Sequence, residues 1–171
     1  MTLRRVLGAA IGLAMLSACA TTTAPQSHAP DAVPHAEGAI YDPSIDASAA
    51  VDAALAQAAA DDKRVLLVMG ANWCQDSRAL ASYLMEPALA AELDANFETV
   101  FVNVGLPQTG DGYNLDIAER FGVSPEGTPN VLLLNSEGEL LNSQDNAVSW
   151  RNSASRTSAD VLEVLQGWSA K

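Results

Sequence analysis

The chain has 171 residues, 49% of them hydrophobic, and its 9 Lys and Arg stand against 21 Asp and Glu, a formal net charge of −12 at pH 7. A surface this acidic argues against nucleic acid and anionic lipid headgroups as partners, because both are polyanions. The length suits one domain preceded by an extension.

The first eighteen residues have the pattern of an export signal. Arg4 and Arg5 precede an apolar run over residues 6–16, and small residues follow it. The run is too short to be a comfortable bilayer span. The string Leu16-Ser17-Ala18-Cys19 resembles the lipobox of bacterial lipoproteins, in which the cysteine is acylated on sulfur and becomes the first mature residue. The alternative is an ordinary cleaved signal peptide whose cysteine is incidental.

A lipidated Cys19 would hold the protein on a membrane without a spanning helix, since each buried CH₂ contributes about 0.8 kcal/mol. Ala20, rather than Asp, follows this cysteine. In lipoproteins of Gram-negative bacteria that pattern implies sorting to the outer membrane, so the expected location is the cell envelope, facing the periplasm. Removing Arg4 and Arg5 with the signal leaves seven cations against 21 acidic groups, a net charge near −14. Acylation of Cys19 would leave Cys74 as the one free thiol.

Residues 19–40 are expected to form a tether. They are mostly Ala, Thr, Pro and polar residues without hydrophobic periodicity, a composition that cannot bury enough apolar surface to become ordered. His28 and His35 lie in this stretch without further metal ligands nearby, so we expect no metal site, and no organic cofactor is implied. Residues 41–171 then have the size of a single domain.

Helical and extended patterns alternate along this domain. Asp46 is a plausible N-cap for the first helix, and Pro87 suits the first turn of another. In chain order, the expected elements are a helix at 46–60, a strand at 65–69, helices at 77–85 and 87–97, a strand at 99–104, a helix at 114–121 closed by Gly122, a strand at 130–134 with a hairpin partner at 140–141, and a helix at 157–168. This order predicts an α/β fold with a central mixed β-sheet flanked by helices.

Four local features together resemble the thioredoxin-like (thioredoxin-fold) family over about three quarters of the chain. They are the strand at 65–69, the turn Trp73-Cys74-x-x-Ser77 into a helix, the strand ending near Val104, and Gly127-Thr128-Pro129 entering a strand. The resemblance implies that the Thr128–Pro129 bond is cis and that Pro129 lies beside Cys74. It also implies that Trp73, Thr128 and Pro129 line a substrate groove.

The placement of Cys74 predicts a nucleophilic thiol. At the start of a helix, unpaired N–H groups and the helix dipole favour the negatively charged thiolate. Arg78 adds a nearby cation and Asp76 opposes it, so we expect moderate activation. Ser77 supplies a hydroxyl that can hydrogen-bond the sulfur, and Trp73 should shield one side of it. The alternative is an inert, buried cysteine in a scaffold that has lost its chemistry.

Two departures from the family pattern restrict the chemistry. Ser77 stands where a resolving cysteine is usual, and Val68 stands where thioredoxins proper carry a buried acid. Internal release of a mixed disulfide is therefore excluded, and general dithiol reduction with it. Forming mixed disulfides, shuffling non-native disulfides or removing glutathione-like caps remains open, with an external thiol reductant as the resolver.

The resulting hypothesis is an envelope-anchored exchange protein that acts on exported proteins or small thiols through mixed disulfides at Cys74. The alternatives are a non-catalytic interaction lipoprotein and a redox sensor whose thiol stops at sulfenic acid or a mixed disulfide. Two stretches are assigned no chemistry: residues 105–114, expected away from the cysteine face, and the polar residues 142–156, where Trp150 is expected in the core. Gln75 and Asp76 are expected to face solvent beside the thiol.

Overall fold

The computed structural model describes residues 40–105 and 112–170. The chain divides into two compact units at residues 31 and 32, and every described residue belongs to the second unit. The expected signal, the acylated Cys19 and the tether lie outside the described residues. Within the described ranges, no helix is long and apolar enough to cross a membrane.

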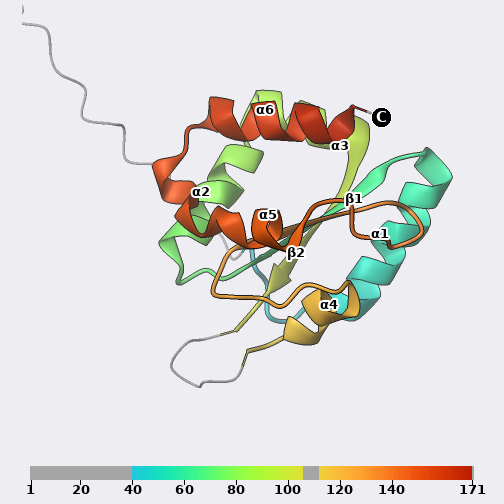
Figure 1. Cartoon of the computed structure of the whole chain (residues 1–171), viewed down its shortest axis with the longest axis horizontal. Helices are drawn as coiled ribbons and strands as arrows, with labels where there is room; N and C mark the ends of the chain where they lie inside the picture. The colour runs from blue at the N-terminus through green and yellow to red at the C-terminus, as the bar shows by residue number, and fades with distance from the viewer. Residues whose placement is uncertain (1–39, 106–111, 171) are drawn as a thin grey trace, which may run out of the picture. The chain divides into compact units, whose positions relative to one another are not determined.

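A three-stranded mixed sheet forms the centre of the domain (Figure 1). Its strands are β1 (Arg64–Gly70), β2 (Phe97–Asn103) and β3 (Asn130–Leu134), in the order β2-β1-β3. β1 runs parallel to β2 and antiparallel to β3, with Leu67 opposite both Val100 and Leu132. The α/β fold and the mixed sheet predicted from the alternating patterns are confirmed.

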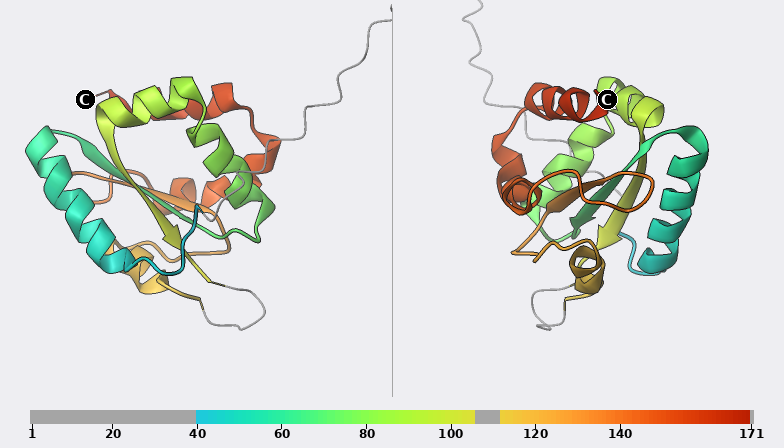
Figure 2. Two further views of the ribbon diagram at one scale, coloured as in Figure 1. Left: turned by 180° about the vertical axis from the view of Figure 1, so that it is seen from behind. Right: turned by 45° about the vertical axis from the view of Figure 1, so that its right-hand side comes forward.

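Helices cover both faces of the sheet (Figure 2). On one face lie α1 (Ala47–Asp61) and α4 (Leu115–Arg120); on the other lie α2 (Gln75–Leu84), α3 (Pro87–Asn96), the 3-10 helix η1 (Ser149–Ser155) and α6 (Ser158–Ser169). The short helix α5 (Gln144–Val148) follows β3 in the chain and packs beside it. The predicted helices are therefore present, with bounds that shift by one or two residues.

Alternate residues of β1 supply two separate layers of the core. Val65, Leu67 and Met69 pack with α1 and α4, whereas Leu66 and Val68 pack with α2, α3 and α6. A strand that is covered on both faces needs apolar residues at every position. This requirement explains the continuous hydrophobic run that marks β1 in the sequence.

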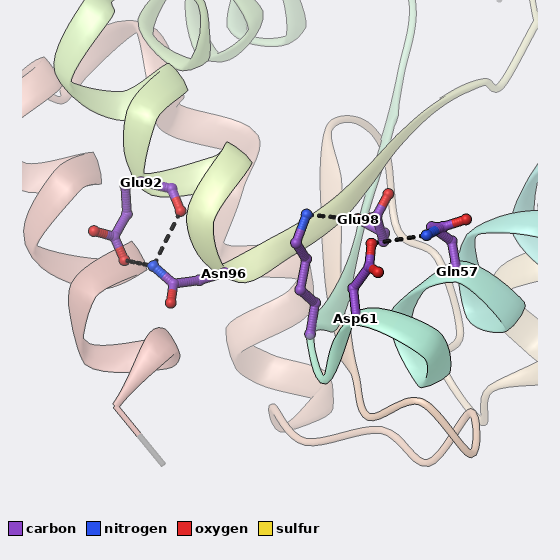
Figure 3. Close-up of polar contacts among 6 residues, drawn as sticks. Gln57, Asp61, Glu92, Asn96 and Glu98 are labelled. Carbon is purple, nitrogen blue, oxygen red and sulfur yellow. Dashed lines mark hydrogen bonds and ion pairs between the residues drawn. The ribbon is translucent and has the colours of Figure 1, made fainter.

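Polar contacts hold the start of β2 to its neighbours (Figure 3). Glu98 accepts a hydrogen bond from the Lys63 ammonium at 2.8 Å, which ties the turn before β1 to β2. The same hydrogen bond raises the pKa of Lys63. At the end of α3, the Asn96 amide donates to the carbonyl and the carboxylate of Glu92, four residues earlier in the helix.

The hairpin partner predicted at 140–141 is short: Leu140 forms a bridge with Leu134, and the Leu141 N–H donates to the Leu133 carbonyl at 2.8 Å. The side chain of Asn142 continues this pairing. Its Oδ1 accepts from the Leu133 N–H and its Nδ2 donates to the Val131 carbonyl, each at 2.9 Å. Because one amide presents the donor and acceptor that a strand backbone would offer, β3 is satisfied without a fourth strand.

The stretch 142–156, which the sequence left without structure, contains α5 and η1. The Ser143 hydroxyl caps α5 by accepting from the Asn146 N–H. Trp150 of η1 is 2% exposed and belongs to the core, as predicted. η1 packs against α2, and this contact brings the segment to the cysteine.

Candidate functional site

Cys74 is the N-cap of α2, as the sequence indicated. It follows the end of β1 through a turn in which its N–H donates to the Ala71 carbonyl at 3.1 Å. Its own carbonyl accepts the first hydrogen bond of the helix, from the Arg78 N–H at 3.1 Å. Backbone N–H groups of the first turn of α2 therefore open toward this residue.

The loop before β3 lies against the sulfur. Cys74 Sγ donates to the Thr128 carbonyl at 3.4 Å, and the Thr128–Pro129 bond is cis, as the family resemblance implied. Pro129 is buried. The structure thus brings Cys74 and the proline loop together across 54 residues of sequence.

The thiol is more covered than expected. Cys74 is only 9% exposed, whereas a nucleophilic thiol must be reached by its substrate. The Thr128 carbonyl accounts for part of this cover. Its neighbours Trp73 and Gln75 are exposed, so the sulfur lies just beneath the surface rather than deep in the core.

Ser77 lies beneath the site and is fully buried. Its Oγ pairs with Thr128 Oγ1 at 3.2 Å, and Thr128 Oγ1 also lies 3.3 Å from the Met69 carbonyl. Hydroxyl groups therefore join α2, the proline loop and β1 directly behind the sulfur. The expected hydrogen bond from Ser77 to the sulfur stays a prediction.

Trp73 borders the site on its exposed side. The residue is 43% exposed, and its indole N–H donates to the Gly105 carbonyl at 2.6 Å. This contact corrects the expectation that residues 105–114 lie away from the cysteine face, because Gly105 adjoins the site through Trp73. The hydrogen bond fixes the indole ring while leaving apolar surface open beside Cys74.

The two charged residues expected to tune the thiol both have structural partners. Arg78 Nη1 donates to the carbonyls of Asn72 and Trp73, at 2.9 and 3.4 Å, and so braces the turn that carries Cys74. Asp76 is half-buried and accepts from the Ala154 N–H of η1 at 2.9 Å. The sequence suggested that Asp76 projects freely into solvent, and this contact corrects that expectation. Their effect on the thiolate stays a prediction.

Sequence reasoning missed Tyr41, which is fully buried beneath the site. Its hydroxyl donates to the Ser77 carbonyl at 3.2 Å. Asn72 holds the Tyr41 backbone on both sides, accepting from its N–H at 3.3 Å and donating to its carbonyl at 2.8 Å. Gly70 leaves room for the ring, since a Cβ there would lie 2.3 Å from Tyr41 Cζ.

Burial raises the pKa of Tyr41 far above its usual value, and the nearby charge of the Cys74 thiolate raises it further, while a hydrogen bond with Ser77 lowers it. The phenol is therefore neutral and acts as a hydrogen-bond donor. No signal near Tyr41 in the sequence pointed to this role, because its partners Asn72 and Ser77 lie 31 and 36 residues away.

Residues 46–136, more than half of the chain, match the family model described as thioredoxin-like. The chain belongs to the thioredoxin-like family. A crystal structure of a disulphide isomerase from Xylella fastidiosa Temecula1 is 30% identical, covers 77% of this chain and 98% of its own, and superposes with a TM-score of 0.69. A solution structure of a thioredoxin from Thermus thermophilus is 22% identical over 67% of this chain and 80% of its own, with a TM-score of 0.47. No curated protein matches the chain.

Within this thioredoxin-like domain, the chemistry available is that of one thiol. Across the residues that the structure describes, His, Cys, Asp and Glu form no group of three that could hold a metal ion. Cys74 faces a peptide carbonyl, and the position of a resolving sulfur holds the buried Ser77. Release of a mixed disulfide from within a site requires a second thiol, and Ser77 offers a hydroxyl instead.

Proposed function

We propose that this thioredoxin-like protein exchanges disulfides through the single nucleophile Cys74, as an isomerase or a deglutathionylase that depends on an external thiol. The observation that carries the proposal is the position of Cys74, at the start of α2 with its sulfur against the carbonyl that precedes the cis-proline. The 30% identity to a protein described as a disulphide isomerase supports the same class of reaction.

The proposed reaction balances with one sulfur from the protein. The Cys74 thiolate attacks one sulfur of a substrate disulfide, the S–S bond breaks, and the other substrate sulfur leaves as a thiolate with the bonding electron pair. The mixed disulfide lasts until an outside thiolate attacks it and restores Cys74. Ser77 would donate to the thiolate, Trp73 and Pro129 would flank the substrate, and Thr128 would pair with its backbone.

We also propose that the protein works on the cell envelope, anchored by a lipid on Cys19 and facing the periplasm. The lipobox-like string and the tether composition support this location. The partners would be exported proteins or small thiols, together with an external reductant. The membrane would be reached through the lipid anchor, and the acidic chain argues against nucleic acid.

The deciding experiment follows mixed disulfides between a disulfide-containing protein and the full chain carrying Cys19→Ala, which leaves Cys74 as its one thiol, and compares it with the same chain carrying Cys74→Ser as well. The chain that keeps Cys74 should form a covalent adduct that persists on a non-reducing gel and disappears when glutathione is added. Cys74→Ser should form none, since a hydroxyl cannot replace the sulfur. Equal capture of partners by both variants under reducing conditions would instead show a non-catalytic interaction protein.

Ser77→Cys provides a gain-of-function arm in the same assay. The side chain is fully buried and lies three residues after the nucleophile. A sulfur at this position would attack the mixed disulfide internally, so the adduct should become short-lived and the released substrate should be reduced. An adduct with unchanged lifetime would show that this position does not reach the Cys74 sulfur.

A further inference from the structure

Half of the cationic residues in the described ranges lie on the cysteine helix α2 and on η1, which packs against it. The described ranges contain six Lys and Arg, and three of them, Arg78, Arg151 and Arg156, belong to α2, η1 or the end of η1. Arg78 is bonded to the carbonyls before Cys74. Arg156 lies 4.4 Å over the Trp150 ring and donates to the Ser149 carbonyl. Arg151 differs because its guanidinium lies beside the proline loop.

The stem of Arg151 crosses the residue that begins this loop. A Cβ at Gly127 would lie 3.1 Å from Arg151 Cδ and 3.9 Å from its Nη1. Gly127 has a φ of +74° and immediately precedes Thr128, whose carbonyl contacts the Cys74 sulfur. The Arg151 guanidinium is thus placed one residue away from the peptide that faces the nucleophile.

The Nε of the Arg151 guanidinium makes a hydrogen bond of normal length, whereas its Nη1 has only a distant ion-pair partner. Arg151 Nε donates to the Val148 carbonyl at 3.0 Å, which orients the group from η1. Its Nη1 lies 3.8 Å from Glu126 Oε2, and these side chains are 46% and 67% exposed. An ion pair this long and exposed contributes little and exchanges readily, whereas a bidentate arginine–carboxylate pair is much stronger.

We propose that Arg151 is a specificity-determining residue that binds a carboxylate carried by the substrate next to its reacting sulfur. The inference rests on the proposed thiol exchange and names its substrate class: acidic disulfides, whether small free molecules or peptide segments with an acidic residue beside the cysteine. Arg151 takes no part in bond making. It holds the carboxylate while Cys74 attacks the adjacent S–S bond and the other sulfur leaves as a thiolate.

The test measures rate constants for mixed-disulfide formation with two aromatic probes, in the full chain carrying Cys19→Ala so that Cys74 is its one thiol. One, 5,5′-dithiobis(2-nitrobenzoate), carries a carboxylate on each half, and the other, 2,2′-dithiodipyridine, is neutral. The ratio of interest is the rate constant with the carboxylate probe divided by that with the neutral probe. Arg151→Gln should lower this ratio about three- to tenfold, the range for one partly exposed ion pair. The loss should shrink at 0.5 M salt because screening weakens exposed pairs. Arg151→Lys should fall between the two proteins.

Arg120→Gln is the matched control. Arg120 also pairs with a carboxylate, that of Asp52, and is 44% exposed, but it belongs to α4 on the opposite face of the sheet. Its substitution should leave the ratio unchanged. Glu126→Gln should raise the ratio, because it removes the competing carboxylate from Arg151. A gain of this kind cannot come from structural damage.

The outcomes distinguish the role of Arg151 from the proposed thiol exchange at Cys74, on which it rests. Failure of wild-type Cys74 to react with the neutral probe would contradict the proposed exchange function itself. Reaction with an unchanged ratio in Arg151→Gln, or equal loss with both probes, would overturn the role of Arg151 alone. Oxidised glutathione and blocked peptide disulfides bearing Glu or Gln beside the cysteine then identify the source. An Arg151 effect with glutathione supports small acidic thiols, and one with the Glu peptide supports protein segments.

Discussion

A single hydroxyl links the first described residues to the cysteine helix. Tyr41 donates to the Ser77 carbonyl while Asn72 holds its backbone, so the turn that carries Cys74 is braced from below. Tyr41→Phe keeps the ring and removes only this hydrogen bond. We expect a loss of about 1 kcal/mol in the free energy of unfolding, the usual net value of one such bond, measured by urea denaturation.

The same variant should change the alkaline stability of the protein. The pKa of Tyr41 is raised in the folded state, whereas a phenol in the unfolded chain titrates near pH 10. Its contribution is complete below about pH 10 and is lost as the pH rises further, because the unfolded state releases the proton first. Above pH 10 the wild type should therefore lose stability more steeply than Tyr41→Phe. Tyr113→Phe, at a 51% exposed position, controls for removal of a phenol, and equal slopes in wild type and Tyr41→Phe would contradict the expectation.

Site residues could be predicted from the sequence when the residues they act with lie close to them in the chain. Cys74, Trp73 and the proline loop were recognisable because each is part of a local pattern with its own spacing. Tyr41 contacts residues 31 and 36 positions away, and nothing near it in the sequence indicates that contact. Asp76 was placed in solvent because its partner lies on η1, a helix that the sequence did not reveal.

At the scale of elements, the side of β3 away from β1 depends on Asn142. Its amide bonds the Leu133 N–H, the Val131 carbonyl and the Asn146 side chain, and the residue is 9% exposed. Asn142→Ala would leave two backbone groups of β3 without these partners. Since each unsatisfied buried group costs about 1–3 kcal/mol, we expect the two groups to lower the free energy of unfolding by about 2–6 kcal/mol, measured by urea denaturation.

Asn96→Ala is a suitable comparison for this element. Among the contacts described, the Asn96 amide bonds only groups of Glu92 within α3. Figure 3 draws these hydrogen bonds. Removal of the Asn96 amide should cost well under half as much as Asn142→Ala. Similar losses in the two variants would show that β3 does not depend on the Asn142 amide.

The elements themselves were predictable where hydrophobic patterns are long. β1 and α6 have continuous or periodic apolar residues, and both were found with bounds close to those observed. The hairpin partner at 140–141 does pair with β3, through the Leu134–Leu140 bridge and the Leu141 N–H, but it does not extend into a strand. Hydrophobic pattern cannot show that the Asn142 side-chain amide continues the pairing. α5 and η1 were missed because they are short and rest on one cap and the burial of Trp150.

At the scale of the whole molecule, the described domain begins beside the turn that carries the cysteine. Tyr41, at the start of the described domain, is bonded to Asn72, two residues before Cys74. The proposed lipid anchor precedes Tyr41 in the chain, so it would join the domain at the end that adjoins the cysteine turn.

The anchor is tested by Cys19→Ala in the full chain. We expect the wild type in the membrane fraction and labelled by a radioactive fatty acid, because acyl chains on Cys19 supply the hydrophobic free energy of anchoring. Cys19→Ala should lose the label and leave the membrane fraction. Adduct formation at Cys74 with a soluble disulfide should be unchanged, since Cys74 and the contacts that position it lie within residues 40–170. A Cys19→Ala variant that remains on the membrane, or a wild type that takes up no label, would contradict the lipid anchor. Neither result would bear on thiol exchange at Cys74, which the Cys74→Ser comparison tests.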